Sequence, residues 1–113
     1  MYVRIARFEG GSVPEIDAEG VRIRRDIEAF RRGEGGGEVP SELTGLIDRI
    51  EMLVDRERGS VAMCVYCDTQ EKLREADRIM NEMSPTSEGW GKRVSVDTYE
   101  LAFDQVLKVA KAA

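Results

Sequence analysis

The chain has 113 residues, 42% of them hydrophobic and 35% charged, which fits one globular domain with a single core. Its net charge of −5, from 17 basic and 22 acidic residues, argues against nucleic-acid binding, which needs a basic surface to displace phosphate counterions. No apolar run reaches the length of a transmembrane helix, and residues 1–15 lack the apolar core of a signal peptide. We therefore expect a cytoplasmic protein without a membrane partner.

The first forty residues predict a strand, a helix and a loop. Residues 2–8 have the composition of a strand and are followed by two glycines. Ser12, with Glu15 three residues later, has the pattern of a helix start. The helix that follows carries one apolar stripe at helical spacing, and a glycine within the stripe suggests close packing on the sheet. The stripe consists of Ile16, Gly20, Ile23, Ile27 and Phe30, and Gly33 ends the helix.

Residues 34–42 contain three consecutive glycines and predict a flexible loop, the best candidate for disorder or a movable lid. The role of the Gly-rich stretch 33–38 stays open at this point. A hairpin is then predicted from Gly45 to Cys67, with a polar turn at 55–59 in which Gly59 takes the left-handed position.

Both strands of this hairpin, 46–54 and 61–67, look apolar on both faces. A strand covered on one side alternates apolar and polar residues, whereas a strand covered on both sides is continuously apolar. The second strand has no charged residue at all, so we expect helices to cover one of its faces and a partner subunit to cover the other.

Cys64 and Cys67 have a CxxC spacing, which invites a metal or redox interpretation. Residues three apart in a strand point to opposite faces, however, so the pair forms neither a disulfide nor a shared metal site. Two cysteines in a chain without histidine also fall short of a zinc site. We expect two small buried side chains, no metal and no cofactor.

The last third of the chain predicts a second helix, a loop, a strand and a tail. Asp68, with Glu71 at the capping-box position, begins the helix, and Pro85 stops it. Residues 84–91 form a loop that holds Trp90, residues 92–103 form the last strand, and residues 104–113 form a tail with the spacing of a short helix. The buried stripe of the second helix consists of Leu73, Ala76, Ile79, Met80 and Met83.

The resulting order, β-α-β-β-α-β, predicts an α+β ferredoxin-like split βαβ domain over residues 1–103, with a four-stranded antiparallel sheet and both helices on one face. The other face would expose an apolar patch too large for a monomer. We therefore expect two sheets to pair face to face in a homodimer.

Four features resemble the dimeric α+β barrel superfamily and, within it, the antibiotic-biosynthesis-monooxygenase-like (ABM-like) proteins. They are the opening strand Tyr2–Phe8, the long first helix, Pro-Ser-Glu-Leu-Thr-Gly at 40–45 and Val-Tyr-Cys-Asp-Thr-Gln-Glu-Lys-Leu at 65–73. The resemblance implies a homodimer with a ligand pocket between sheet and helices. The chain also departs from the family pattern. It lacks the axial histidine that the haem degraders use, and its first strand lacks the Asn that the oxygenases tend to use. Those oxygenases also tend to use a Trp near the second helix. In this chain the single Asn, Asn81, is near the end of the second predicted helix and the single Trp, Trp90, is in the following loop, so no catalytic residue is carried over.

Four residues are candidates for contacting a ligand: Arg4, Tyr66, Trp90 and Tyr99. Arg4 with a neighbouring carboxylate could fix an anionic substrate, although cross-strand ion pairs are the favoured explanation of the strand charges. The tyrosines could hold an aromatic ligand or simply lie at an interface. Trp90, flanked by glycines, could gate a pocket, although packing inside the protein or on the partner is favoured. The strand charges are Arg4, Arg49, Glu51, Asp97 and Glu100.

These residues favour a protein that binds a small apolar or aromatic molecule, in its enzymatic version a cofactor-independent monooxygenase. The alternative is a non-catalytic dimerisation or interaction module whose pocket is filled by its own side chains. A cavity of several hundred Å³ with converging polar groups would favour the first, and a closed core would favour the second.

Overall fold

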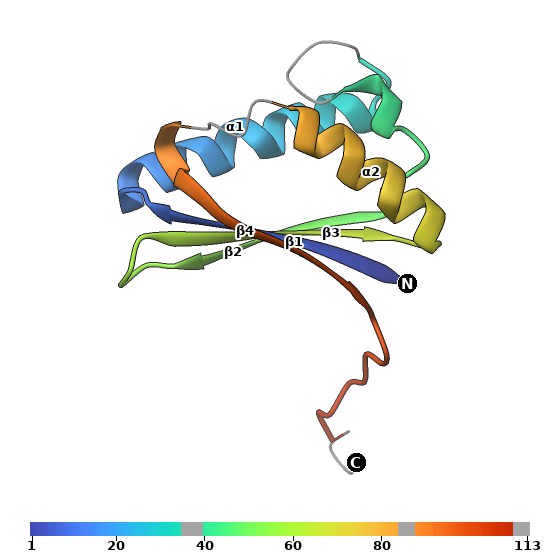
Figure 1. Ribbon diagram of the computed structural model, residues 1–113. Helices are drawn as coiled ribbons and strands as arrows, with labels where there is room; N and C mark the ends of the chain where they lie inside the picture. The colour runs from blue at the N-terminus through green and yellow to red at the C-terminus, as the bar shows by residue number, and fades with distance from the viewer. Residues whose placement is uncertain (35–39, 84–87, 110–113) are drawn as a thin grey trace.

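The computed structural model of the protein describes residues 1–34, 40–83 and 88–109. Its elements occur in the predicted order, with two short 3-10 helices (η1 and η2) in addition (Figure 1). They are β1 (Tyr2–Gly10), α1 (Val13–Arg31), η1 (Ser41–Leu43), β2 (Arg49–Asp55), β3 (Ser60–Cys67), α2 (Gln70–Glu82), η2 (Glu88–Trp90) and β4 (Gly91–Glu100).

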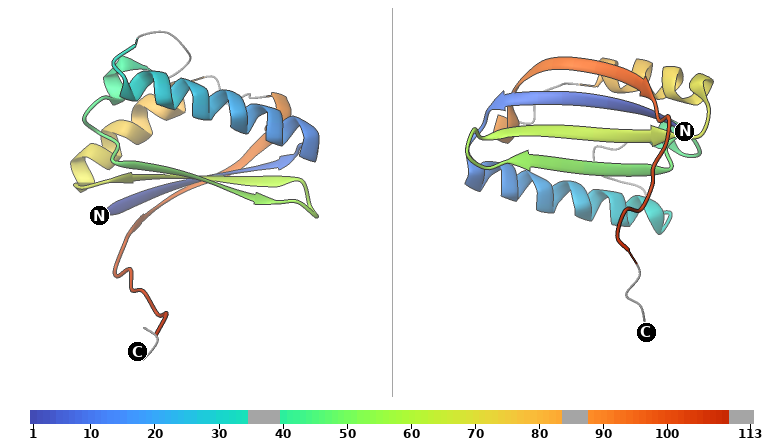
Figure 2. Two further views of the ribbon diagram at one scale, coloured as in Figure 1. Left: turned by 180° about the vertical axis from the view of Figure 1, so that it is seen from behind. Right: turned by 90° about the horizontal axis from the view of Figure 1, so that it is seen from below.

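The four strands form one antiparallel sheet in the order β2-β3-β1-β4. Both helices lie on the same side of the sheet, and in the described part of the chain no element lies on the other side (Figures 1 and 2). This arrangement confirms the ferredoxin-like split βαβ fold. We call the side without helices the open face; it carries every second residue of each strand.

The core lies between the sheet and the helices, in two clusters. α2 packs directly on β1 and β3, whereas α1 lies closest to η2. The first cluster consists of Ala6, Phe8, Ile16, Val61, Met63 and Trp90, and the second of Leu43, Val65, Cys67, Leu73, Ala76 and Ile79. The covered face of the sheet therefore supplies half of these core residues.

β2 differs from its prediction, because it begins at Arg49 rather than at residue 46. Leu46 and Ile47 precede the strand and pack against the second cluster. Within the strand, half-buried Met52 packs against the first cluster while Leu53 is 57% exposed. The open face of the strand carries Arg49 and Glu51 beside Leu53, so the expectation that this edge strand is apolar on both faces is wrong.

β3 is buried on both faces, as predicted, but the reason lies within the sheet itself. Ala62 and Cys64 belong to the open face and are 9% and 4% exposed. Ala62 is flanked across the strands by Leu53 and Arg7, and longer neighbours of this kind shield a small side chain from water. Low exposure of β3 therefore does not by itself require a partner subunit.

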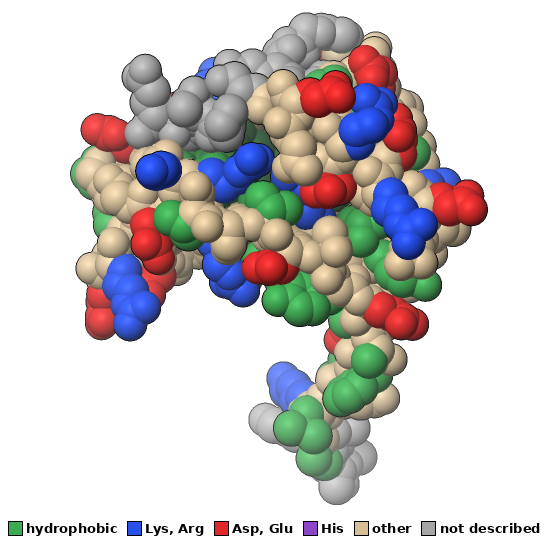
Figure 3. All heavy atoms as spheres, viewed as in Figure 1, with side chains coloured by type: hydrophobic (Ala, Val, Ile, Leu, Met, Phe, Trp, Pro, Cys, Tyr) green, Lys and Arg blue, Asp and Glu red, His purple; other side chains and the backbone are tan. Residues whose placement is uncertain are grey.

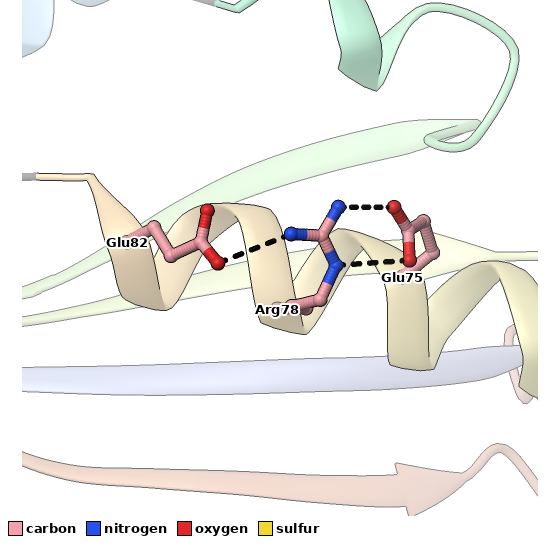
Figure 4. A network of polar contacts seen from close by, with 3 residues as sticks. All are labelled: Glu75, Arg78 and Glu82. Carbon is pink, nitrogen blue, oxygen red and sulfur yellow. Dashed lines mark hydrogen bonds and ion pairs between the residues drawn. The ribbon is translucent and has the colours of Figure 1, made fainter.

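The two helix starts differ in how they are capped. Thr69 is the N-cap of α2, and its Oγ1 accepts a hydrogen bond from the Lys72 backbone N–H at 3.1 Å. This helix therefore starts one position later than the predicted Asp68. Ser12 is the N-cap of α1, as predicted, but its side chain makes no capping hydrogen bond. The solvent side of α2 carries a surface ion network in which Arg78 bonds Glu75 and Glu82 (Figure 4).

Two predicted segments change their boundaries. Ser41–Leu43, expected within the flexible loop, forms η1 and buries Leu43; residues 35–39, on which the lid prediction rests, lie outside the described residues. β4 ends at Glu100 rather than at residue 103. Residues 101–109 are neither helix nor strand, so the predicted short helix is wrong for residues 104–109.

Candidate functional site

A cavity of about 670 Å³ lies between the sheet and the two helices. It exists because α2 rests on the sheet while α1 approaches mainly η2. In Figure 3, Lys and Arg side chains lie around a hollow whose visible interior is apolar. The floor of the cavity comes from β1 and β3 through Ala6, Phe8 and Met63, and part of its wall comes from Met80 and Met83.

The apolar stripe of α1 serves two purposes along its length. Ile16, at the beginning of the helix, is fully buried in the first core cluster. Ile23, Ile27 and Phe30 are only half-buried and line the cavity. Helical periodicity predicts which side chains face the sheet, but it does not tell a packed core from the wall of a cavity.

Arg4 lies at the cavity and is held in place by α2. It is 2% exposed; its Nε donates to Asp77 Oδ1 at 2.8 Å and its Nη2 donates to Asn81 Oδ1 at 2.9 Å. Its partners therefore come from the helix above, not from a neighbouring strand as the favoured explanation held. Within the described residues, Nη1 makes no hydrogen bond or ion pair.

Arg93 reaches the same place because of a β-bulge. The register of β4 on β1 shifts between Arg7, opposite Ser95, and Phe8, opposite Arg93, which leaves Val94 as an extra residue. Strand alternation without the bulge would put Arg93 on the open face with Ser95. With the bulge, Arg93 shares the covered face with Phe8, lines the cavity, and its Nη1 donates to Asn81 Oδ1 at 3.4 Å. No carboxylate of the described chain pairs with it.

Trp90 is 6% exposed and lines the cavity. Its ring packs edge-on against Phe8, with centroids 5.1 Å apart. The indole Nε1 is buried and has no hydrogen-bond partner in the described part of the chain. An unpaired buried donor of this kind costs about 1–3 kcal/mol.

The glycines beside Trp90 permit close backbone approach rather than swinging. A Cβ on Gly91, whose φ is +81°, would lie 2.0 Å from the Glu9 carbonyl oxygen. A Cβ on Gly89 would lie 2.7 Å from Glu19 Cγ. The gate suggested by the sequence is therefore replaced by a fixed side chain that packs inside its own protomer.

Tyr66 and Tyr99 lie on the open face, since both are opposite Val3 in the sheet. The Tyr66 hydroxyl donates to Glu51 Oε1 at 2.7 Å, and this hydrogen bond, with burial and the Glu51 charge, raises the pKa of Tyr66 to about 12. Arg49 completes the group, 3.0 Å from Glu51 Oε2 and over the Tyr66 ring. The structure thus brings Arg4 and Trp90 together at the cavity and separates both tyrosines from them.

The cavity is locally basic in an acidic protein. Its described lining residues include six arginines and three carboxylates, but the guanidinium of Arg49 contacts Glu51 and Tyr66 on the open face, which leaves a formal surplus of two positive charges at the cavity, while the chain carries −5. The lining arginines are Arg4, Arg22, Arg24, Arg31, Arg49 and Arg93, and the carboxylates are Asp26, Glu28 and Asp48. A partly apolar cavity with this charge favours anions.

Nucleophilic catalysis by a cysteine and metal binding have less support in the described residues. Both thiols are free, and burial raises the pKa of Cys64 and of Cys67, which disfavours the thiolate that a nucleophile needs. Cys67 belongs to the second core cluster and Cys64 to the open face, as the strand spacing predicted. No three His, Cys, Asp or Glu side chains among the described residues come together as metal ligands.

Sequence reasoning missed three residues of the site, Asp77, Asn81 and Arg93. A signal existed for the first two, because residues four apart on a helix share one face and a buried strand arginine needs acceptors. Arg93 had no such signal, since a bulge is not visible in the strand pattern.

Comparisons with models of protein families, with curated proteins and with solved structures found no match. No helix within the described ranges is long and apolar enough to cross a membrane. Function must therefore be argued from the cavity itself.

Proposed function

We propose that the cavity binds a small, largely apolar or aromatic molecule that carries an anionic oxygen. The observation that carries this proposal is a set of hydrogen-bond donors without acceptors on residues that line a partly apolar cavity: Trp90 Nε1, Arg4 Nη1, and the Nε and Nη2 of Arg93, whose Nη1 alone is bonded, to Asn81. They are neighbours, because Arg4 and Arg93 share Asn81 Oδ1 while Phe8 contacts Trp90 and lies opposite Arg93.

The shape of the cavity supports a ligand of this class. Its volume of about 670 Å³ is in the range of small-molecule sites, which are mostly apolar with a few placed polar groups. The floor residues would contact the ring system, and the donors would bind a carboxylate or enolate oxygen with charge-assisted hydrogen bonds. Such an acceptor would also satisfy the indole N–H. A module whose pocket is filled by its own side chains would not be expected to have a cavity of this volume.

The oxygenase activity implied by the resemblance to ABM-like proteins stays a prediction. A cofactor-independent oxygenase needs a dry, shaped cavity that holds an electron-rich enolate or phenolate while O₂ reacts with it. The same donors would hold the oxygen of that anion. Oxygen uptake by ligand-loaded protein is the measurement that separates turnover from binding.

Trp90 supplies its own probe, because it is the single tryptophan of the chain. We would titrate the protein with 2-naphthoate and with its neutral isostere 2-naphthamide and follow quenching of the Trp90 fluorescence. We expect the carboxylate to bind about tenfold more tightly or better, since hydrogen bonds to charged groups exceed neutral ones by that margin.

The matched variants are Arg93→Gln and Lys92→Gln. Each removes one positive charge, but Lys92 is an exposed neighbour outside the cavity lining. We expect Arg93→Gln to abolish the preference for the carboxylate and Lys92→Gln to retain it. Equal binding of acid and amide by the unchanged protein, or equal effects of the two variants, would refute the proposal. Native mass spectrometry of freshly purified protein would show whether a ligand of this class is retained.

A further inference from the structure

The segment after β4 carries large apolar side chains that are almost fully exposed. We call residues 101–109 the arm. The arm is attached to the sheet at its first residue, where the Leu101 N–H donates to the Met1 carbonyl oxygen at 2.9 Å. The following large apolar side chains are almost fully exposed: Phe103 82%, Val106 80%, Leu107 91% and Val109 84%. Four such side chains within seven residues differ from the scattered apolar residues of an ordinary surface.

The arm leaves the sheet on the open-face side, away from both helices (Figures 1 and 2). The middle of that face is apolar along β1 and β3, and partly exposed apolar or aromatic side chains continue it on the edge strands. Leu53 on β2 is 57% exposed and Tyr99 on β4 is 51% exposed. The apolar residues of the inner strands are Val3, Ile5, Ala62 and Cys64. One molecule therefore has an apolar arm and an apolar surface that do not meet.

The length of the arm and the charges of the arm and the open face are compatible with a contact between two molecules. Nine extended residues span about 30 Å, while four strands lie within roughly 15 Å, so an arm is long enough to cross a whole sheet. The arm contains one acidic residue, Asp104, and one basic residue, Lys108. The open face also carries both signs, for example Arg7 and Asp97, so no strong repulsion opposes the contact.

We propose that the arm of one protomer docks on the open face of a second copy of the chain, and that the second arm returns the contact. A twofold axis makes both contacts identical, so two copies cover two arms and two open faces at once. This inference is independent of the proposed ligand, because the cavity lies on the covered face.

The first test is the mass of the protein in solution over a range of concentrations, by sedimentation or light scattering. We expect a dimer for the full chain and a folded monomer after truncation behind Leu101. Truncation behind Val109, which removes only residues 110–113, is the control and should leave the dimer intact. Circular dichroism checks that the truncated chain keeps its helices and sheet.

A point substitution avoids the question of folding. Leu107→Asp should weaken dimerisation roughly tenfold or more, because the side chain is 91% exposed in its own protomer and the substitution removes its apolar burial on the partner. Val21→Asp introduces the same charge at an α1 residue that is 59% exposed, and it should change nothing. A monomeric full chain, with its arm either free or protected from proteolysis by its own sheet, would overturn the proposal. A dimer that is insensitive to Leu107→Asp and to truncation would do so as well.

Discussion

Residues of similar type are buried for different reasons, or not at all, on the two faces of the sheet. On β1, Arg4 points to the covered face, is 2% exposed and is fixed by two side chains of α2. Arg7, three residues later, lies on the open face and is exposed. On β3, Val65 belongs to a core cluster, while Cys64 on the other face is shielded by its neighbours in the sheet. Burial on the covered face comes from tertiary packing, whereas burial on the open face comes from the sheet itself.

The largest expected effect follows from placing a charge on each face. Val65→Asp would bury a carboxylate without a partner beneath α2, where Val65 is 0% exposed. We expect a loss of ~4 kcal/mol or more, comparable with the whole stability of a domain of this size, so that the variant is largely unfolded.

Leu53→Asp is the comparison on the open face, where Leu53 is 57% exposed. We expect it to change the free energy of unfolding by less than about 1 kcal/mol. Urea unfolding should be followed at the lowest practical concentration, where a second copy contributes least. Equal losses in the two variants would mean that the faces are covered alike.

The next effect concerns the two arginines of β1. Arg4→Met leaves Asp77, whose side chain is 31% exposed, without its ion-pair partner, and it removes the donor to Asn81. We expect a loss of ~2 kcal/mol, less than for a fully buried pair because Asp77 keeps some contact with water. Arg7→Met, on the other side of the same strand, should stay within about 0.5 kcal/mol. Denaturant unfolding of both variants measures the difference, and its absence would show that the bonds of Arg4 to α2 add no stability.

A smaller effect tests how tightly α1 covers the sheet. A Cβ on Gly20 would meet Met52 Sδ at 3.4 Å, an ordinary contact distance. Since alanine is the better helix former, Gly20→Ala should stabilise the protein by up to ~1 kcal/mol. The midpoint of thermal unfolding reports the change. A lower midpoint would indicate that Met52 cannot yield and that α1 lies closer to β2 than the distances suggest.

The smallest effect is a titration on the open face. An ordinary tyrosine has a pKa of about 10, and the hydrogen bond to Glu51 raises the pKa of Tyr66 to about 12. The neutral phenol therefore stabilises the fold fully below about pH 10. That contribution is lost as the pH rises through about 12.

Phenolate absorbance should show this late step, and Tyr66→Phe should remove it. Glu51→Gln should bring the pKa back toward its ordinary value, because the charge that favours the neutral phenol is gone. A late step that persists in Tyr66→Phe would assign it to another group.

Element order and most strand boundaries could be predicted from the sequence, because period-two and helical patterns report local conformation directly. The glycines were informative in the same way: Gly59 and Gly33 have φ of +65° and +74° and end a turn and a helix as expected. The error at β2 arose because Leu46 and Ile47 are apolar through a tertiary contact that precedes the strand.

The site could be predicted only in part. Arg4 and Trp90 stood out because a charge in a strand and a single indole are unusual, but their partners are more than seventy residues away or across the sheet. Tyr66 and Tyr99 are candidate ligand contacts by residue type but lie on the open face, because residue type does not say which face of a sheet a pocket occupies. The distance between α1 and the sheet depends on contacts of α1 with η2, and no sequence pattern predicts it.

The extra residue in β4 makes the face that Arg93 occupies depend on strand pairing as well as on residue type. Removal of Val94 would place Arg93 directly before Ser95, so Arg93 would stay opposite Phe8 on the covered face and the pairing with β1 would become regular. If Val94 were kept and paired regularly with Phe8, Arg93 would instead lie opposite Glu9 on the open face, and the cavity would lose a cation although no residue type had changed. For related chains, an alignment gap at this position would therefore leave the charge of the cavity unchanged.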